Sequence, residues 1–429
     1  MKTLYVLIYI ILFFTCNSIL AAQPEQKLLI PVIVEGEQIK QLLGKKIEHI
    51  RAYAFRNGKP TLIPFQIDQK DSKGNWVWEK VLNANQHEMK NYDDEDRSRE
   101  NIFDDNDQIV FMAIDAGEKV EKPSEKIAFS EILELKITAG KSGHSNWIYV
   151  TYHSFSVPSK SNTHYMEYQA DKKMVKSPVY SLTYSKKYIA VMDEMTVAGQ
   201  SLINQTIING KVDVNFILFN SSIEFNEKEI NGYSVGYING PIRTIIQFMT
   251  FVNLGAGIQS MALNVDHIFY PNHTEIPILI NKGYFVKNMS IRIGANYSYT
   301  DSCQIYNPGL EIMTDVNKSR AGISLMSDIH PQLLMLNNSA YSMSTFLKIP
   351  TELKEKISTQ AYIKNEVSHE LKNKPTDNSK LAGFYLRTRE NFPSGQHQLK
   401  VVSIFSDKPY IYKKANIFNE KIFIVTKKI

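Results

Sequence analysis

From residue 213 to residue 299 the sequence repeats one pattern, a long segment rich in aromatic and β-branched residues that ends near Gly, Asn or Pro. Five such segments follow one another, at residues 213–219, 233–238, 242–252, 258–269 and 285–299. Aromatic and β-branched side chains favour strands, and the chain carries 23 Tyr and 21 Phe. Segments with a helical period are scarce. Serial long strands joined by turns are typical of antiparallel sandwiches, so we expect an all-β fold.

Strand length divides the chain into two parts. The first part contains short strand candidates, including residues 75–79 and the continuously apolar run 108–114, which is typical of a buried strand. A Ser-rich stretch, 154–163, is expected to be a linker, and the strands become longer beyond it. We therefore predict an N-terminal β-rich, sandwich-like domain over residues 23–157 and a larger antiparallel β-supersandwich-like domain over residues 158–429.

Two segments of the C-terminal part carry separate predictions. Residues 350–380 are highly charged and poor in large apolar side chains, so we expect a charged, exposed excursion from the larger domain. Residues 421–425 alternate like a strand, and we expect them to close the larger sandwich.

The first 22 residues have the layout of a secretory signal peptide. Met1 and Lys2 give a positive start, residues 4–15 are an almost unbroken apolar run, and Ala21 and Ala22 are small residues at its end. The apolar run is short for a membrane span. We expect export to the periplasm or the extracellular space, an uncleaved anchor being the alternative because Leu20 stands where a small residue is preferred.

Cysteine content and charge exclude several classes of protein. After removal of residues 1–22 only Cys303 remains, so no intramolecular disulfide can form and core packing must hold the fold. A net charge of +5, spread over 429 residues, is too weak to indicate nucleic acid as a partner. No later apolar run reaches the length of a transmembrane helix. Phosphate-loop and dinucleotide-loop motifs are absent.

An acidic stretch at residues 93–107 is the candidate metal site. It includes Asp104, Asp105 and Asp107, and carboxylate oxygens are the ligands that calcium prefers. The spacing does not match an EF-hand loop. Asp and Asn also fix turns through local backbone hydrogen bonds, so a solvated turn before the buried strand is the alternative. Calcium is the one cofactor that the sequence suggests.

Trp76 and Trp78 are the candidate ligand-binding residues. Two positions apart on a strand, their side chains would point to the same face. Paired aromatic faces can stack on the apolar C–H surfaces of sugars. Glu79 and Lys73 would suit a polar rim. The alternative is that both indoles pack into a hydrophobic core between the domains.

The segment 266–275 holds the candidate catalytic residues. His267, Tyr270 and Glu275 are suited to general acid–base chemistry, and Arg243 could bind a substrate carboxylate through two hydrogen bonds. His267 would act as base or acid and Tyr270 as proton donor. The alternatives are a polar hairpin tip for the segment and a structural ion pair for Arg243.

Several blocks resemble a family of exported bacterial proteins for which no activity is established. They lie at residues 63–68, 103–117, 147–150, 240–243 and 383–386. In the first two blocks we expect Phe65, Ile67, Val110 and Met112 to be buried, and Asp68 and Asp107 to fix turns. The long strands and the Gly-Pro-Ile-Arg block are also similar to galactose-mutarotase-like supersandwiches. That resemblance implies sugar binding or processing, and catalysis of that type needs His267 and Glu275 to converge.

Three functional hypotheses remain open. The first is an exported protein that binds a glycan or another ligand of the cell envelope. The second is a carbohydrate-active enzyme of the polysaccharide lyase or epimerase type. The third is a structural partner in an envelope assembly.

Overall fold

A computed structural model of the chain describes residues 30–82, 101–139, 145–215, 220–255, 258–260, 262–283, 286–298, 304–307, 312–315, 323–325, 332–364, 380–409 and 422–428. These residues form strands and short 3-10 helices, with no α-helix among them. The strands pair in four antiparallel sheets. The all-β fold predicted from the sequence is confirmed. The predicted signal peptide, residues 1–22, and Cys303 lie outside the described residues.

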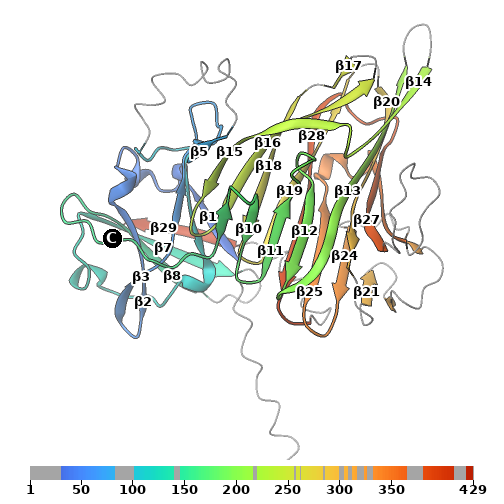
Figure 1. The fold of residues 1–429 in the computed structure, drawn as a ribbon. Coiled ribbons are helices and arrows are strands. Elements are labelled where there is room, and N and C mark those ends of the chain that lie inside the picture. Colours follow the sequence, from blue (N-terminus) through green and yellow to red (C-terminus); the bar gives the residue numbers. More distant parts are fainter. Residues whose placement is uncertain are drawn as a thin grey trace, which may run out of the picture.

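Two smaller sheets come mainly from the N-terminal part of the chain, coloured blue to cyan in Figure 1. Their buried side chains include Ile109 and Phe111 from one sheet and Leu133 and Ile148 from the other. We call this pair the small sandwich. The three-stranded sheet has the order β1 (Pro31–Glu35), β6 (Gln108–Met112) and β4 (Gln66–Asp68). The five-stranded sheet has the order β29 (Ile422–Lys428), β7 (Glu131–Ala139), β8 (Ser145–Tyr152), β2 (Ile50–Arg56) and β3 (Lys59–Leu62).

Two larger sheets face each other in the remainder of the chain, and we call them the large sandwich (Figure 1). The ten-stranded sheet has the order β23 (Ile323–Leu325), β26 (Ile357–Lys364), β27 (Lys380–Thr388), β20 (Val286–Tyr297), β13 (Gln200–Asn215), β12 (Met192–Val197), β11 (Tyr180–Tyr184), β10 (Met174–Lys176) and β9 (Glu167–Gln169), with β14 (Asn220–Asn226) paired to β13. The eleven-stranded sheet has the order β22 (Ile312–Asp315), β21 (Gln304–Asn307), β24 (Gln332–Asn337), β25 (Ser342–Lys348), β28 (Gly395–Ser406), β19 (His273–Lys282), β18 (Leu263–Tyr270), β16 (Thr244–Gly255), β15 (Ile230–Asn239) and β5 (Lys80–Val81), with β17 (Ile258–Gln259) paired to β16.

Short 3-10 helices connect some of these strands. They are η1 (Gly36–Gln38), η2 (Lys40–Leu42), η3 (Ile47–His49), η4 (Ala113–Asp115), η5 (Pro123–Glu125) and η6 (Thr351–Leu353). None of the helices in the described part of the chain has the length and apolar character needed to cross a membrane.

Strand β6 explains the continuous apolar run in the sequence. All five of its residues are buried, because both faces of its sheet are covered. Ile109 and Phe111 face the core of the small sandwich, whereas Val110 and Met112 pack with Ile242 of the large sandwich. A strand that is covered on both faces needs apolar side chains at successive positions.

Two C-terminal segments differ from the sequence-based expectation. Residues 422–428 pair with β7 of the small sandwich rather than closing the large one, and the red strand lies among blue and cyan ones in Figure 1. Alternation along a strand specifies its faces but not the sheet that it joins. Residues 357–364 are strand β26 within the ten-stranded sheet, with Ile357, Thr359 and Ala361 buried, not an exposed excursion. The charges of that region obscured this period-2 pattern, and residues 365–379 lie outside the described residues.

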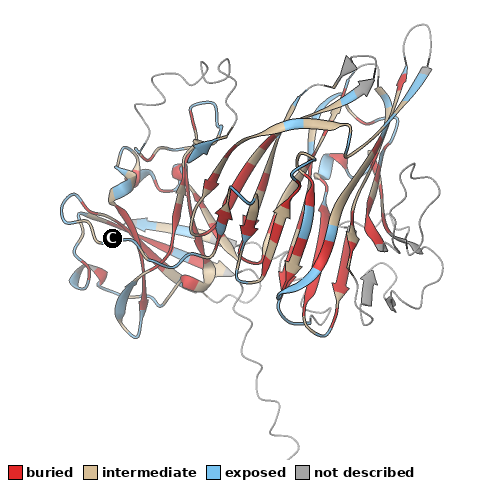
Figure 2. Ribbon diagram, in the orientation of Figure 1, coloured by how far each residue is buried: buried red, intermediate tan, exposed pale blue. Residues whose placement is uncertain are grey.

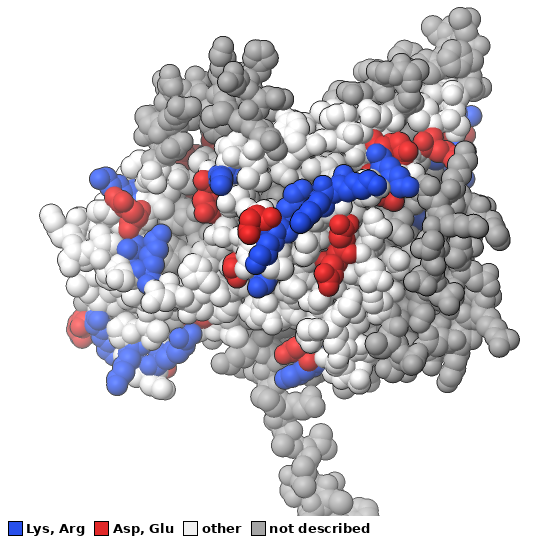
Figure 3. Space-filling model, in the orientation of Figure 1, with Lys and Arg blue, Asp and Glu red and all other residues white. Residues whose placement is uncertain are grey.

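Burial and charge vary along the large sandwich. In Figure 2 its strands contain buried segments, and partly exposed residues are frequent toward the end where β14 and β17 lie. Figure 3 shows a band of Lys and Arg side chains over the strands around β10 to β13, with Asp and Glu side chains beside it. The face is therefore of mixed charge, in agreement with the small net charge of the chain.

Candidate functional site

The two sandwiches meet where the three-stranded sheet contacts the turn between β15 and β16. Val110, Met112 and Ile242 form a buried cluster there, with Tyr165 packed against it. The hydroxyl of Tyr165 donates to both carboxylate oxygens of Asp115, at 2.9 and 3.1 Å. The junction thus combines apolar packing with buried hydrogen bonds.

Arg243 is the centre of the polar contacts at the junction. Its Nε donates to Asp68 Oδ2 at 2.7 Å, its Nη1 to the Tyr270 hydroxyl at 3.1 Å, and its Nη2 to Gln108 Oε1. Gln66 accepts the backbone N–H groups of Ile242 and Arg243 and donates to Asp68 Oδ1 at 2.6 Å. We call these five side chains, Arg243, Asp68, Tyr270, Gln108 and Gln66, the junction network.

The bare backbone of Gly240 makes this contact between the sandwiches geometrically feasible. A Cβ atom on Gly240 would lie 2.0 Å from the side chain of Gln66. Any larger residue would therefore prevent Gln66 from reaching the amides at positions 242 and 243. The Gly-Pro-Ile-Arg block thus carries both the close approach and the arginine.

The structure favours an ion-pair role for Arg243 over binding of a substrate carboxylate. Arg243 is 1% exposed and Asp68 also 1%. Burial alone would lower the pKa of Arg243, but the Asp68 carboxylate and Tyr270 raise it overall, so the guanidinium stays charged. All three guanidinium nitrogens donate to protein acceptors. Asp68, expected to fix a turn, instead accepts from Arg243, which is far away in the sequence.

The candidate catalytic residues lie on two faces of one sheet. Tyr270 belongs to the junction network and stacks on His273, with ring centroids 4.4 Å apart. Glu275 pairs with Lys400 at 2.9 Å. Burial alone would raise the pKa of Glu275, but Lys400 lowers it overall. Tyr270 and Glu275 are therefore close to the junction, at the hairpin between β18 and β19.

His267 lies on the opposite face of β18, between the two large sheets. It is three residues from Tyr270 in the same strand, so the two side chains point in opposite directions. Its Nδ1 is hydrogen-bonded to the Tyr184 hydroxyl at 2.6 Å, and the rings of Phe248 and Phe269 surround it. Burial lowers its pKa to about 3. The structure does not bring His267 together with Arg243 and Tyr270.

Trp76 and Trp78 have different partners, and the segment 75–79 is not a regular strand. Trp76 forms an isolated bridge with Lys70, donates from Nε1 to Asp266 Oδ2 at 2.9 Å, and lies under the Arg243 guanidinium, 5.4 Å from the ring centroid. Trp78 packs on the backbone of Gly236, where an added Cβ would be 2.6 Å from the indole. Both indoles are partly exposed.

The acidic segment forms a hydrogen-bonded turn in its described part. Asp107 is fully buried and accepts the backbone N–H groups of Lys70 and Asp104, each at 3.0 Å. Asp104 accepts the N–H of Asn106, and the backbone carbonyl of Asp105 accepts from Glu37. Burial raises the pKa of Asp107 to about 7, against the effect of its two N–H donors. Among the described residues no group of three or more acidic, His or Cys side chains is arranged to hold a metal ion, and residues 93–100 lie outside them.

A cavity of about 440 Å³, with both polar and apolar side chains in its wall, lies at the junction beside the junction network. Its wall includes Trp78 and Glu79 from the segment before β5, and the loop residues Lys160, Ser161 and His164. Gln66 and Asp68 also line it. An aromatic ring beside several hydrogen-bonding groups can bind a polar ligand that has apolar C–H patches. We call this space the junction cavity.

The loop side of the junction cavity was not predicted from the sequence. Lys160 and Ser161 belong to the stretch predicted as a linker, and His164 follows it directly. Their composition is typical of a surface loop, and only the fold places them opposite Trp78. The prediction of Glu79 as a polar neighbour of the Trp pair is consistent with its place in the wall.

Comparison with known proteins gives a likeness of fold only. No protein-family model matches the chain, and no match was found among curated protein sequences. A glycosyl hydrolase family 38 protein from Enterococcus faecalis is 8% identical, with a TM-score of 0.48, over 93% of this chain and 46% of that one. An alpha-mannosidase from E. faecalis V583 is 8% identical, with a TM-score of 0.42, over 91% and 47%.

A smaller protein matches part of the chain. A putative aldose 1-epimerase from Escherichia coli K12 is 6% identical, with a TM-score of 0.32, over 53% of this chain and 96% of that one. The chain spans about half the length of the two Enterococcus proteins.

Proposed function

We propose that the protein is exported and binds a carbohydrate in the junction cavity. The observation that carries the proposal is the wall of this cavity, where the indole of Trp78 lies beside Glu79, Ser161 and His164. Sugar rings present apolar C–H faces and a rim of hydroxyl groups, and an aromatic side chain with flanking polar groups complements both. Glu79 is already held by the backbone N–H of Asn239 at 2.9 Å, so its carboxylate is oriented before a ligand binds.

The export part of the proposal depends on residues 1–22. Their positive start, apolar run and small residues are the pattern that the secretion machinery recognises. N-terminal sequencing of the protein recovered outside the cytoplasm should begin at Gln23. A chain that stays in the cytoplasm would contradict export, whereas an exported chain that keeps Met1 would indicate the uncleaved anchor.

Titration of the protein with neutral and acidic oligosaccharides, followed by calorimetry, tests the binding site. We expect saturable binding of at least one saccharide, and a loss of affinity of about tenfold or more in Trp78→Ala, because stacking on the indole is removed. Trp147→Ala is the matched control, since Trp147 lies in β8 of the small sandwich and should leave affinity unchanged. Near-ultraviolet circular dichroism of each variant monitors folding. Equal affinity in the Trp78→Ala and wild-type proteins, or no binding across the panel, would reject the proposal.

A further inference from the structure

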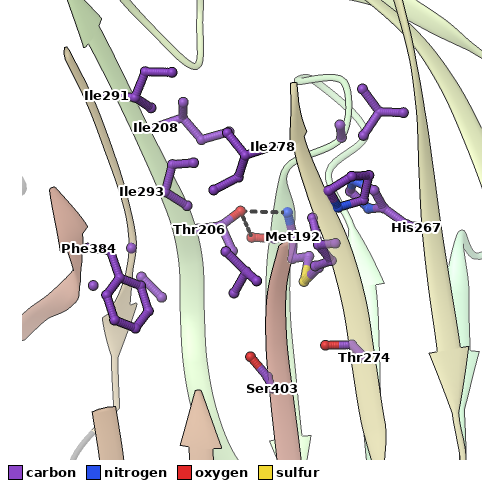
Figure 4. Close-up of a pocket in the computed structure, with 18 of the residues that line it drawn as sticks. Met192, Thr206, Ile208, His267, Thr274, Ile278, Ile291, Ile293, Phe384 and Ser403 are labelled. Carbon is purple, nitrogen blue, oxygen red and sulfur yellow. Dashed lines mark hydrogen bonds between the residues drawn. The ribbon is translucent and has the colours of Figure 1, made fainter. Parts of the chain in front are cut away.

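The interior of the large sandwich contains a second cavity, of about 260 Å³. It lies between the two large sheets and is separate from the junction cavity. Its wall consists mainly of aliphatic and aromatic side chains, and Figure 4 shows Ile208, Ile278, Ile291, Ile293 and Phe384 around it. We call it the inter-sheet cavity. Protein interiors are packed so densely that few voids exceed the size of a water molecule. An apolar cavity of about 150 Å³ already holds benzene.

Several polar groups in this wall have protein partners. Thr206 Oγ1 accepts the backbone N–H of Met192 at 2.9 Å (Figure 4). Ser403 is hydrogen-bonded to the Thr345 hydroxyl at 3.1 Å. The Nδ1 of His267 is hydrogen-bonded to the Tyr184 hydroxyl. These groups have their partners in the protein, and a space with such a wall favours an apolar occupant over water.

The cavity is long and opens toward one end of the sandwich. Along β20 its wall includes residues from Ile291 to Tyr297, a distance of roughly 20 Å at the rise of a strand. At one end the core is closed, with Ile246 and Phe269 fully buried. Toward the other end, near β14 and β17, the wall residues Val252 and Leu263 are only partly buried. This end therefore offers a route of entry.

We propose that the inter-sheet cavity binds a single acyl chain. One leaflet of a bilayer has a hydrocarbon layer of about 15 Å, half of the ~30 Å core, so the wall along β20 is long enough to contact an extended chain of that length. Each methylene moved from water to an apolar site contributes about 0.8 kcal/mol. The wall has many apolar groups to contact a chain along its length. The site is independent of the junction cavity, and either proposal can fail without the other.

The proposal is tested with two probes, palmitate and the naturally fluorescent fatty acid cis-parinaric acid, and with a variant whose larger side chain fills the cavity. The wild-type chain should bind cis-parinaric acid saturably, and palmitate should displace it. Ile293→Trp places an indole in the cavity. Because each displaced methylene weakens binding about fourfold, this variant should lose at least about tenfold in affinity.

A matched control lies on the other face of the neighbouring strand. Ile208 and Ile293 are register partners that face the cavity, whereas Ile207 precedes Ile208 and points outward. Ile207→Trp should bind the probes as the wild type does. Equal weakening in both Trp variants would indicate surface binding and reject the proposal, as would unchanged affinity in Ile293→Trp or no saturable binding to the wild type.

A second variant keeps the test decisive if Ile293→Trp does not fold. Ile208→Ala enlarges the cavity, so the chain length of the preferred saturated fatty acid should increase; an unchanged preference would contradict the proposal. The source of the chain is determined with phosphatidylethanolamine vesicles. Extraction of phospholipid from them indicates a lipid ligand, whereas binding of palmitate without extraction indicates a free fatty acid.

Discussion

At the junction between the sandwiches, charged and polar side chains are buried and almost every one has a named partner. Between the two large sheets the opposite holds, since the wall is apolar and a space of about 260 Å³ remains. The first arrangement depends on direction, because hydrogen bonds require specific atoms at specific positions. The second depends on area, because hydrophobic burial has no direction. The apolar interior of a sandwich can therefore tolerate a cavity. A junction of buried charges cannot tolerate the loss of a hydrogen-bond partner.

This difference separates two roles in the molecule. The junction network fixes how the small sandwich sits on the large one, and with it the position of Trp78 relative to His164 across the junction cavity. The inter-sheet cavity lies within one sandwich, whose sheets are each held by their own ladders. Substitutions in the junction network should thus change the stability of the whole chain. Substitutions in the inter-sheet cavity should mainly change the binding of a ligand there.

Removal of Arg243 should produce the largest effect. Arg243→Met leaves the Asp68 carboxylate buried without its cation, which costs about 3–5 kcal/mol of unfolding free energy. The measurement is urea unfolding at neutral pH. The double variant with Asp68→Leu should recover part of the loss, because the uncompensated charge is then removed as well.

An exposed ion pair provides the control for this prediction. Lys122 and Glu125 lie 2.9 Å apart with side chains 72% and 63% exposed, so Lys122→Met should change the unfolding free energy by less than about 1 kcal/mol. A loss of that small size in Arg243→Met would show that the junction network does not hold the sandwiches together.

Local patterns in the sequence were sufficient for the all-β class and for the burial of β6. For Arg243 they suggested binding of a substrate carboxylate, with an ion pair as the alternative, but they did not indicate its partner Asp68, which is 175 positions away. Asp68 stands before a turn-like segment, and its local context favoured a turn. Position in a sheet is decided by contacts between distant segments, and a single sequence does not record them. For the same reason β29 was assigned to the wrong sandwich, and the loop residues 160–164 were not connected with Trp78.

The candidate site shows the same limit at the level of one strand. His267 and Tyr270 lie on opposite faces of β18. The alternation of side chains along a strand separates the two residues. Each of them therefore depends on partners from other elements. Here β11 supplies Tyr184 to His267 and the small sandwich supplies Asp68 to Arg243. Neither pairing has a signal in the spacing of the sequence.

Acid titration should have a smaller effect than removal of Arg243, and it should act in opposite directions on buried groups of the large and the small sandwich. Burial lowers the pKa of His267 to about 3 and that of His273 to about 4, against about 6.5 in an unfolded chain. The unfolded state therefore binds more protons than the folded state below pH 6.5. Each His contributes stability that is complete above that pH and falls by about 2 kcal/mol at about pH 5.

Asp107 of the small sandwich opposes this trend, so the total pH dependence does not isolate the histidines. Its pKa is raised to about 7, and the folded state holds a proton there that the unfolded state loses above about pH 4; this carboxyl makes the fold more stable as the pH falls toward 4. The difference between wild type and His267→Gln removes that term, because both proteins contain Asp107. Urea unfolding at about pH 7.5 and about pH 5 should show a drop that is about 2 kcal/mol smaller in the variant. Equal drops in the two proteins would mean that His267 becomes charged within the folded sandwich, and an interior open to water would then replace the apolar one described above.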